Sequence, residues 1–158
     1  MNRIPVTVEG AEKLKAELHH LKTVERPKVI DAIAEARALG DLSENAEYEA
    51  AKHKQSFIEG RIAEIEHKLS LLQVIDPKEI DADGRCVFGA TVTLESVASG
   101  EQVTYQIVGD DEADIKEGKI SISSPIARAL IGKFEGDTVE VDAPGGSREY
   151  EILEVRYT

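Results

Sequence analysis

The segment Gly40-Asp41-Leu42-Ser43-Glu44-Asn45-Ala46-Glu47-Tyr48 decides the fold of the N-terminal half, because it separates two long stretches of helical periodicity. We expect it to turn the chain back on itself and to cap a helical hairpin. Asp41 and Glu44 would then stand at the tip of a long, rigid rod. Carboxylates presented in this way are suited to holding a hard divalent cation such as Mg²⁺.

Apolar residues on both sides of this segment recur at alternating steps of three and four, with polar Gln55 filling the one gap in the second stripe, which is the heptad pattern of a coiled coil. They are Ala11, Leu14, Leu18, Leu21, Val29, Ile33 and Ala36 before it, and Tyr48, Ala51, Ile58, Ile62, Ile65, Leu69 and Leu72 after it. The first stripe slips near Pro27, whose missing backbone donor predicts a kink or a short break. The second helix is expected over residues 42–75, with a length of about 50 Å at ~1.5 Å per residue. Because each helix has a single apolar stripe, the two should pack as an antiparallel coiled coil.

The pattern changes after residue 75. Residues 76–84 contain helix-breaking and turn residues and are predicted to form a linker. Strand-like runs separated by glycines follow at residues 86–88, 90–95, 102–108, 119–123, 137–141 and 149–157. One short helix is expected at residues 125–132, with Ser124 as its cap and Pro125 in its first position.

The sequence therefore predicts an α+β chain. Residues 1–75 form a long α-helical coiled-coil hairpin with an acidic tip, residues 76–84 a linker, and residues 85–158 a compact antiparallel β domain with one short helix.

The net charge of −12 is unevenly distributed. Residues 1–75 carry 11 Lys/Arg and 13 Asp/Glu, a net of −2, whereas residues 76–158 carry 8 and 18, a net of −10. A C-terminal half this acidic should not wrap nucleic acid, because a protein's affinity for nucleic acid comes mostly from neutralising phosphates. A protein surface with a basic patch is the expected partner. The nearly neutral N-terminal half, with Arg37, Lys52 and Lys54 within a few turns of the tip, is the expected place for a phosphate contact.

Other function classes lack their motifs. The chain has no Walker lysine loop and no dinucleotide fingerprint. Its single cysteine, Cys86, excludes an internal disulfide and a multi-cysteine zinc site. No apolar run is long enough to span a bilayer and residues 1–10 lack a signal pattern, so we expect a cytoplasmic protein with no membrane partner. The Asp41-x-x-Glu44 spacing also matches a capping box, which is the structural alternative to a metal-holding role.

Three segments resemble the bacterial Gre transcript-cleavage factors. They are Ile33-Ala34-Glu35-Ala36-Arg37-Ala38-Leu39-Gly40-Asp41-Leu42-Ser43-Glu44-Asn45-Ala46-Glu47-Tyr48, Ile107-Val108-Gly109-Asp110-Asp111-Glu112-Ala113-Asp114, and Ile122-Ser123-Ser124-Pro125-Ile126-Ala127-Arg128-Ala129-Leu130-Ile131-Gly132-Lys133. The resemblance extends over essentially the whole chain. It implies an FKBP-like fold for the C-terminal domain, in agreement with the organisation derived from periodicity.

The resemblance implies that the protein binds RNA polymerase and inserts its coiled coil into the secondary channel. Asp41 and Glu44 would then complete the polymerase's own catalytic Mg²⁺ site and stimulate cleavage of the nascent RNA 3′ end in backtracked complexes. The factor would need no cofactor of its own and would not be an enzyme by itself.

The resemblance also implies roles for other residues. Arg37 and Lys52 match basic positions that face RNA, and the globular domain docks on polymerase, with candidates at Ser123, Ser124, Pro125 and Ile126. A weak DNA contact and a monomeric state complete the expectations.

Two alternatives belong to other functional classes. An inhibitory Gre-like protein would enter the same channel and block it, but such relatives carry altered tip carboxylates. An FKBP-like prolyl isomerase would need an aromatic-lined pocket, which a chain with three Phe and no Trp is poorly equipped to build.

Overall fold

The computed structural model describes residues 3–40 and 45–158, and its internal contacts divide the chain into two units. The hairpin unit spans residues 11–72. The globular unit contains residues 73–158 together with the N-terminal segment up to Gly10. The sequence assigned that segment to the hairpin, whereas its strand β1 (Ile4–Thr7) pairs with β2 (Leu72–Ile75) in a two-stranded sheet.

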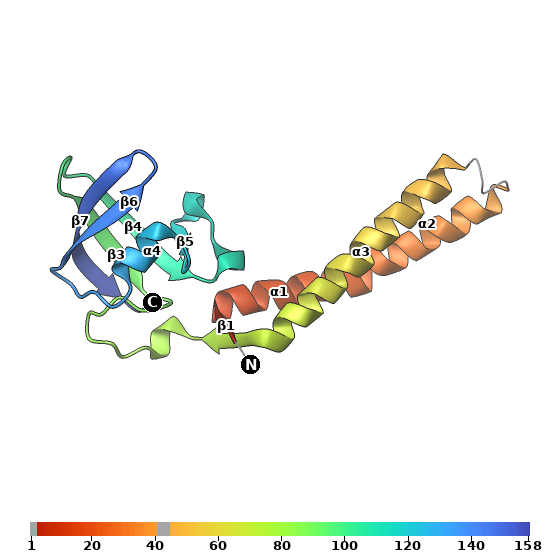
Figure 1. The fold of residues 1–158 in the computed structure, drawn as a ribbon. Coiled ribbons are helices and arrows are strands. Elements are labelled where there is room, and N and C mark those ends of the chain that lie inside the picture. Colours follow the sequence, from red (N-terminus) through yellow and green to blue (C-terminus); the bar gives the residue numbers. More distant parts are fainter. Residues whose placement is uncertain (1–2, 41–44) are drawn as a thin grey trace. The chain divides into compact units, whose positions relative to one another are not determined.

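The first arm of the hairpin is helical throughout, although it changes its pitch once. It consists of α1 (Val8–His20), the π-helical turn η1 (Leu21–Glu25) and α2 (Arg26–Ala38). Its partner in the hairpin is α3 (Ala46–Leu71), which runs back along α2 (Figure 1).

The π turn accounts for the slip in the apolar stripe. Leu21 and Val29 are eight residues apart, one more than a heptad, and a wider helical turn takes up the extra residue. Within it the N–H of Arg26 donates to the carbonyl of Leu21, and the Thr23 hydroxyl donates to the carbonyl of His19 at 2.7 Å. Pro27 follows directly, in the first turn of α2. The break predicted near Pro27 is thus a change of helix type, and Leu18 and Leu21 on its N-terminal side pack against Ile58 and Ile62 of α3.

The apolar stripes form the core of the hairpin, as the heptad pattern predicted. The buried side chains are Val29, Ile33 and Ala36 on α2, and Ala51, Ile58, Ile62 and Ile65 on α3. Leu18 and Leu21 pack against the cluster made by Val29, Ile58 and Ile62. Burying an aliphatic side chain of this size stabilises the fold by about 1.5–3 kcal/mol.

The second helix is shorter than the predicted range of residues 42–75. It has 26 residues, which gives about 39 Å at ~1.5 Å per residue. At its start Asn45 has an extended backbone and acts as the N-cap. At its end Leu72 turns to an extended conformation (ψ 141°) and enters β2, where strand pairing with β1 replaces helical hydrogen bonds.

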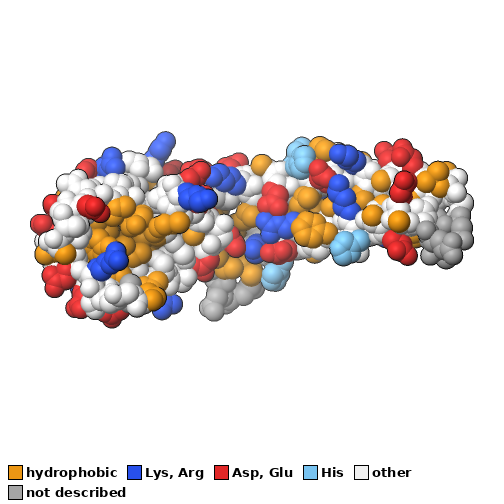
Figure 2. Space-filling model, turned by 90° about the horizontal axis from the view of Figure 1, so that it is seen from above, with side chains coloured by type: hydrophobic (Ala, Val, Ile, Leu, Met, Phe, Trp, Pro, Cys, Tyr) orange, Lys and Arg blue, Asp and Glu red, His pale blue; other side chains and the backbone are white. Residues whose placement is uncertain are grey.

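Ion pairs cover the surface of the hairpin, where cations and carboxylates interleave in the face that Figure 2 shows. Two pairs are bidentate and join the arms: Arg26 with Glu59 at 2.8 and 2.7 Å, and Arg61 with Glu17 at 2.6 and 2.7 Å. The Arg61 guanidinium holds the pKa of Glu17 below its ordinary value of 4.5 through its hydrogen bonds. These pairs fix the register of the arms, because bidentate geometry is specific.

A five-stranded sheet forms the globular unit. Its strands are β3 (Thr91–Ser96), β4 (Gln102–Val108), β5 (Lys119–Ser121), β6 (Thr138–Ala143) and β7 (Gly146–Arg156), in the order β5-β4-β3-β7-β6. All neighbours pair antiparallel except β4 and β5, which are parallel.

The helix α4 (Pro125–Leu130) contributes Ala127 and Leu130 to a core that also contains Leu94, Ile107 and Ile152. Ser124 caps it as predicted, since its hydroxyl accepts the N–H of Ala127 at 3.3 Å. No helix in the described ranges is both long and apolar enough to cross a lipid bilayer.

The strand predicted at residues 86–88 is wrong. The N–H of Cys86 donates to the carbonyl of Lys133 at 2.7 Å, and its carbonyl accepts from Gly132 at 2.9 Å. Its backbone is therefore held by the loop after α4 and not by a sheet neighbour.

The short helical turns outside the sheet are η2 (Pro77–Glu79), η3 (Asp110–Glu112) and η4 (Ile115–Glu117).

Candidate functional site

Asn45 joins the two arms at the end of the hairpin. Its side-chain oxygen accepts the N–H of Tyr48 at 3.0 Å, which caps α3, while its amide nitrogen donates to the carbonyl of Ala36 at 2.8 Å, near the end of α2. On the other arm Gly40 has φ 108°, a conformation that favours glycine, and its N–H donates to the carbonyl of Arg37. One side chain therefore satisfies both helix ends and holds them together.

The candidate metal-holding residues Asp41 and Glu44 lie outside the described residues. Along the chain they fall between Gly40 and Asn45, the two described ends of the arms. The capping-box alternative is nevertheless wrong for α3, because Asn45 and not Asp41 is the N-cap. The sequence missed Asn45, although asparagine is a preferred N-cap residue and stands directly before the helical stretch.

Arg37 and Lys52, far apart in sequence, line the same depression on the hairpin. It has a volume of about 260 Å³, and its other walls are Ile30, Ile33, Ala34 and Gln55. Both cations are exposed, and Lys52 donates to the side chain of Gln55 at 3.2 Å. Neither forms an ion pair with a residue that the structure describes.

Four other cations of the hairpin are engaged by carboxylates. Lys54 lies 3.8 Å from Glu25, Lys22 lies 3.2 Å from Glu66, and Arg61 and Arg26 hold the bidentate pairs. The depression at Arg37 and Lys52 consequently offers two cations that an external anion can reach without breaking an ion pair to any residue in the described ranges 3–40 and 45–158.

The four docking candidates lie at the start of α4, and they are not equivalent. Ser124 is half-buried and used as the helix cap, and Ile126 is half-buried against the core. Ser123 and Pro125 are exposed. The structure thus leaves the exposed pair available for an external contact.

Asp110 holds the loop that carries Ser123. Its carboxylate accepts hydrogen bonds from the hydroxyls of Ser121 and Ser123, the latter at 2.7 Å. These hydroxyls, Ser121 first, lower the pKa of Asp110 below its ordinary value of 3.8. Sequence analysis did not single out Asp110, because the contact crosses from the turn after β4 to the loop after β5.

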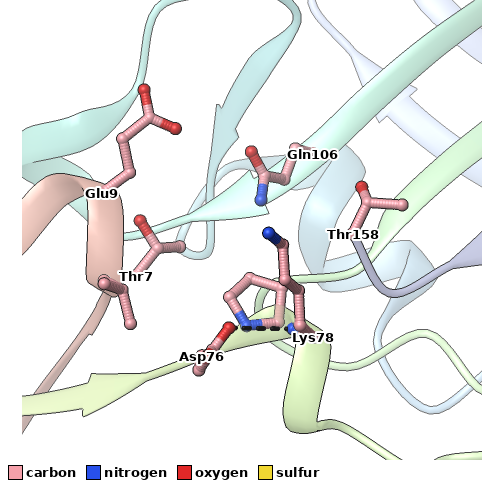
Figure 3. Close-up of a pocket in the computed structure, with 8 residues that line it drawn as sticks. Thr7, Glu9, Asp76, Lys78, Gln106 and Thr158 are labelled. Atoms are coloured by element: carbon pink, nitrogen blue, oxygen red, sulfur yellow. Dashed lines mark hydrogen bonds between the residues drawn. The ribbon is translucent and has the colours of Figure 1, made fainter.

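A second depression, of about 320 Å³, lies in the globular unit (Figure 3). Its walls include Thr7 and Glu9 near the start of α1, Asp76 and Lys78 around η2, and Gln106 on β4. The Asp76 side chain accepts the N–H of Lys78 at 3.0 Å. Within the described residues no buried side-chain nitrogen or oxygen atom is without a partner, so this lining gives no signal for a specific ligand.

Two family models match the chain in succession. The model for the N-terminal domain of transcription elongation factors GreA and GreB matches residues 4–74, and the model for their C-terminal domain matches residues 81–157. The transcription elongation factor GreA of Neisseria meningitidis serogroup A is 70% identical to this chain, and that of Verminephrobacter eiseniae is 71% identical. Each alignment has 157 residues and covers 99% of both chains.

Solved structures of two similar proteins cover the chain as well. The GreA/GreB elongation factor from Nitrosomonas europaea is 25% identical, with a TM-score of 0.44, over 99% of this chain and 100% of its own. GreA factor homolog 1 of Thermus thermophilus is 29% identical, with a TM-score of 0.44, over 98% of this chain and 99% of its own.

Proposed function

Since this chain belongs to the GreA/GreB family of transcription elongation factors and therefore acts on RNA polymerase in elongation and cleavage, we propose how it does so. The hairpin enters the secondary channel of the polymerase and delivers Asp41 and Glu44 to the active centre. There it stimulates cleavage of the RNA 3′ end in backtracked complexes. The proposal is carried by the two hydrogen bonds of the Asn45 side chain, to Ala36 and Tyr48, which we call the Asn45 clamp. The clamp holds together the two helix ends between which the carboxylates stand in the chain.

The two carboxylates supply hard oxygen donors of the kind that Mg²⁺ prefers. The ion belongs to the polymerase, where a metal pair supports hydrolysis by polarising the phosphate and activating water. In this proposal Asp41 and Glu44 add ligands to that site and orient the attacking water. The protein has no cofactor of its own and acts through the nuclease activity of the polymerase.

Arg37 and Lys52 are proposed to contact the phosphates of the extruded RNA. Their shared depression supports this role, because both side chains are exposed and neither has a carboxylate partner among the described residues. Phosphate contacts of this kind give affinity that falls as salt rises. Substituting either cation should therefore weaken cleavage more at low salt than at high salt.

The loop before α4 is proposed to dock on the polymerase through Ser123 and Pro125. Both side chains are exposed, and the Asp110 carboxylate holds the loop by accepting the hydroxyl of Ser123. Residues 78–158 by themselves should compete with the full chain for polymerase without stimulating cleavage. The buried core cluster of the sheet lies entirely between Cys86 and Val155, so this fragment retains it. We further propose a monomer that acts in the cytoplasm and contacts DNA only weakly.

The proposed delivery of carboxylates is tested with Asp41→Ala and Glu44→Ala. Each should abolish RNA cleavage in a stalled, backtracked complex while polymerase binding stays nearly intact. Glu49→Ala is the matched control, because Glu49 is an exposed carboxylate in the first turn of α3. Full stimulation by either tip variant, or equal loss in the control, would refute the assignment.

A further inference from the structure

Glu112 links the start of α1 to the turn that follows β4. Its Oε2 atom accepts the backbone N–H of Thr7 at 3.1 Å and that of Gly109 at 2.8 Å. Its other oxygen accepts the hydroxyl of Thr7. Thr7 lies 105 residues away in the sequence and is buried, with only 4% of its surface exposed. A single carboxylate thus satisfies two backbone donors and a buried hydroxyl.

The arrangement is a capping box whose carboxylate comes from a distant part of the chain. Thr7 begins α1, since its hydroxyl accepts the N–H of Gly10 at 3.1 Å. In an ordinary capping box a Glu three residues after the cap would accept the N–H of the cap residue. Here that position is Gly10, and Glu112 accepts the Thr7 N–H in its place.

Gly10 makes room for this contact. A Cβ atom at position 10 would lie 2.0 Å from Oε1 of Glu112 and 2.3 Å from its Cδ, so any side chain would displace the carboxylate. At Gly109 a Cβ atom would lie 2.7 Å from the carbonyl oxygen of Pro5. Both glycines are therefore required by the close approach of the N-terminal segment to the turn after β4.

The same short turn, η3, also holds the loop before α4. Asp110, at its first position, binds the hydroxyls of Ser121 and Ser123, and Glu112, at its last, binds the start of α1. A second link, between Lys119 and Glu9 at 3.2 Å, reinforces the attachment of the first helical turn. From that turn α1 continues without interruption into the hairpin unit.

We propose that Glu112 is a positioning residue for RNA cleavage. It attaches the helix that leads into the hairpin to the turn that braces the docking loop, so that polymerase docking and tip delivery are mechanically coupled. The proposal rests on the proposed function, in which the globular unit docks and the hairpin delivers carboxylates. Without Glu112 the start of α1 would lose its hydrogen bonds to η3 and keep the Lys119–Glu9 pair.

The test compares three full-length variants at rising concentration in the RNA cleavage assay. Glu112→Ala should lower maximal cleavage about tenfold or more, because small misplacements of reacting groups are costly. The half-saturating concentration should change less than about threefold, because the docking loop keeps Asp110. Glu140→Ala, which removes an exposed carboxylate from β6, is the control and should behave as the parent.

The decisive variant combines Gly10→Glu with Glu112→Ala. It restores the capping box within α1 but leaves the helix unattached to η3. Amide hydrogen exchange should show renewed protection at Thr7 and none at Gly109, and maximal cleavage should stay low. Recovery of cleavage in this variant would mean that Glu112 is a helix cap only, and the proposal would be abandoned.

Further measurements distinguish loss of the Glu112 link from misfolding of the alanine variant and from failure of the carboxylate-delivery mechanism. Glu112→Gln keeps the size of the side chain and one acceptor oxygen, so it remains folded if the alanine variant does not, and it should show a smaller loss of the same kind. Unchanged maximal cleavage in both would overturn the proposal. The exchange measurement needs no polymerase, so it reports on the Glu112 link even if the tip variants were to show that carboxylate delivery is wrong.

Discussion

Replacing Asn45 by alanine should destabilise the hairpin by about 2 kcal/mol. The loss of the N-cap bond to Tyr48 costs about 1 kcal/mol. The loss of the 2.8 Å bond to the carbonyl of Ala36 costs about another 1 kcal/mol, the usual net value for a hydrogen bond inside a protein. The arms would also lose their only described side-chain link at the tip end.

The assay is urea unfolding followed by the far-ultraviolet circular dichroism of the helices. Asn45→Ser separates the two contributions, because serine is an equally good N-cap but its side chain is too short to reach Ala36. It should lose about 1 kcal/mol, half the effect of alanine. Asp41→Ala should change the stability by less than about 0.5 kcal/mol, because Asp41 does not cap α3.

Two results would refute this reasoning. If Asn45→Ala unfolds at the same urea concentration as the parent, the clamp contributes nothing to the hairpin. If Asp41→Ala is instead the destabilised variant, the cap has been assigned to the wrong residue. RNA cleavage measured on the same proteins should fall with Asn45→Ala even at saturating concentrations, since the two helix ends are no longer held together.

Three further outcomes are expected. Arg61 holds the pKa of Glu17 below 4.5 in the folded hairpin, so the pair stabilises the hairpin above that pH and this stabilisation is lost as the pH falls further. The free energy of unfolding in urea should therefore vary less with pH for Glu17→Gln than for the parent. Gly60→Ala should stabilise α3 by up to about 1 kcal/mol, because a Cβ atom there meets nothing within 4 Å, whereas Gly118→Ala, at φ 73° and 3.0 Å from the carbonyl of Thr104, should destabilise in the same unfolding assay. Deleting one matched heptad from each arm should withdraw the tip by roughly 10 Å at about 1.5 Å per residue and abolish cleavage at saturating concentrations; unchanged cleavage would exclude delivery by reach, since metal ligation tolerates only a few tenths of an ångström.

Periodicity carried most of the prediction of the fold. The stripes predicted the hairpin and its core, from Val29 to Ile65, because burial at steps of three and four is a local property of a helix. The slip near Pro27 was expected to produce a kink or a short break, whereas a wider helical turn takes up the extra residue between Leu21 and Val29. The cap at Ser124 was equally local, because its partner, Ala127, is three residues away.

The errors of the sequence analysis arise where distant segments compete for the backbone. Residues 86–88 looked like a strand, but Cys86 exchanges its hydrogen bonds with Gly132 and Lys133. The second helix was predicted to continue to residue 75, but Leu72 leaves it for strand pairing with β1. In both cases the intrinsic preference was overridden by a partner that no local window contains.

The sequence by itself determined that the protein is a hairpin followed by a β domain, and it identified Arg37 and Lys52 as candidates. Only the tertiary structure decided that these two cations line one depression, that Asn45 bridges to Ala36, and that Glu112 completes the cap of a helix 105 residues away. The physical reason is range. Periodicity and capping are set by neighbours within a turn or a heptad, whereas a side chain that reaches a distant backbone depends on how whole elements pack.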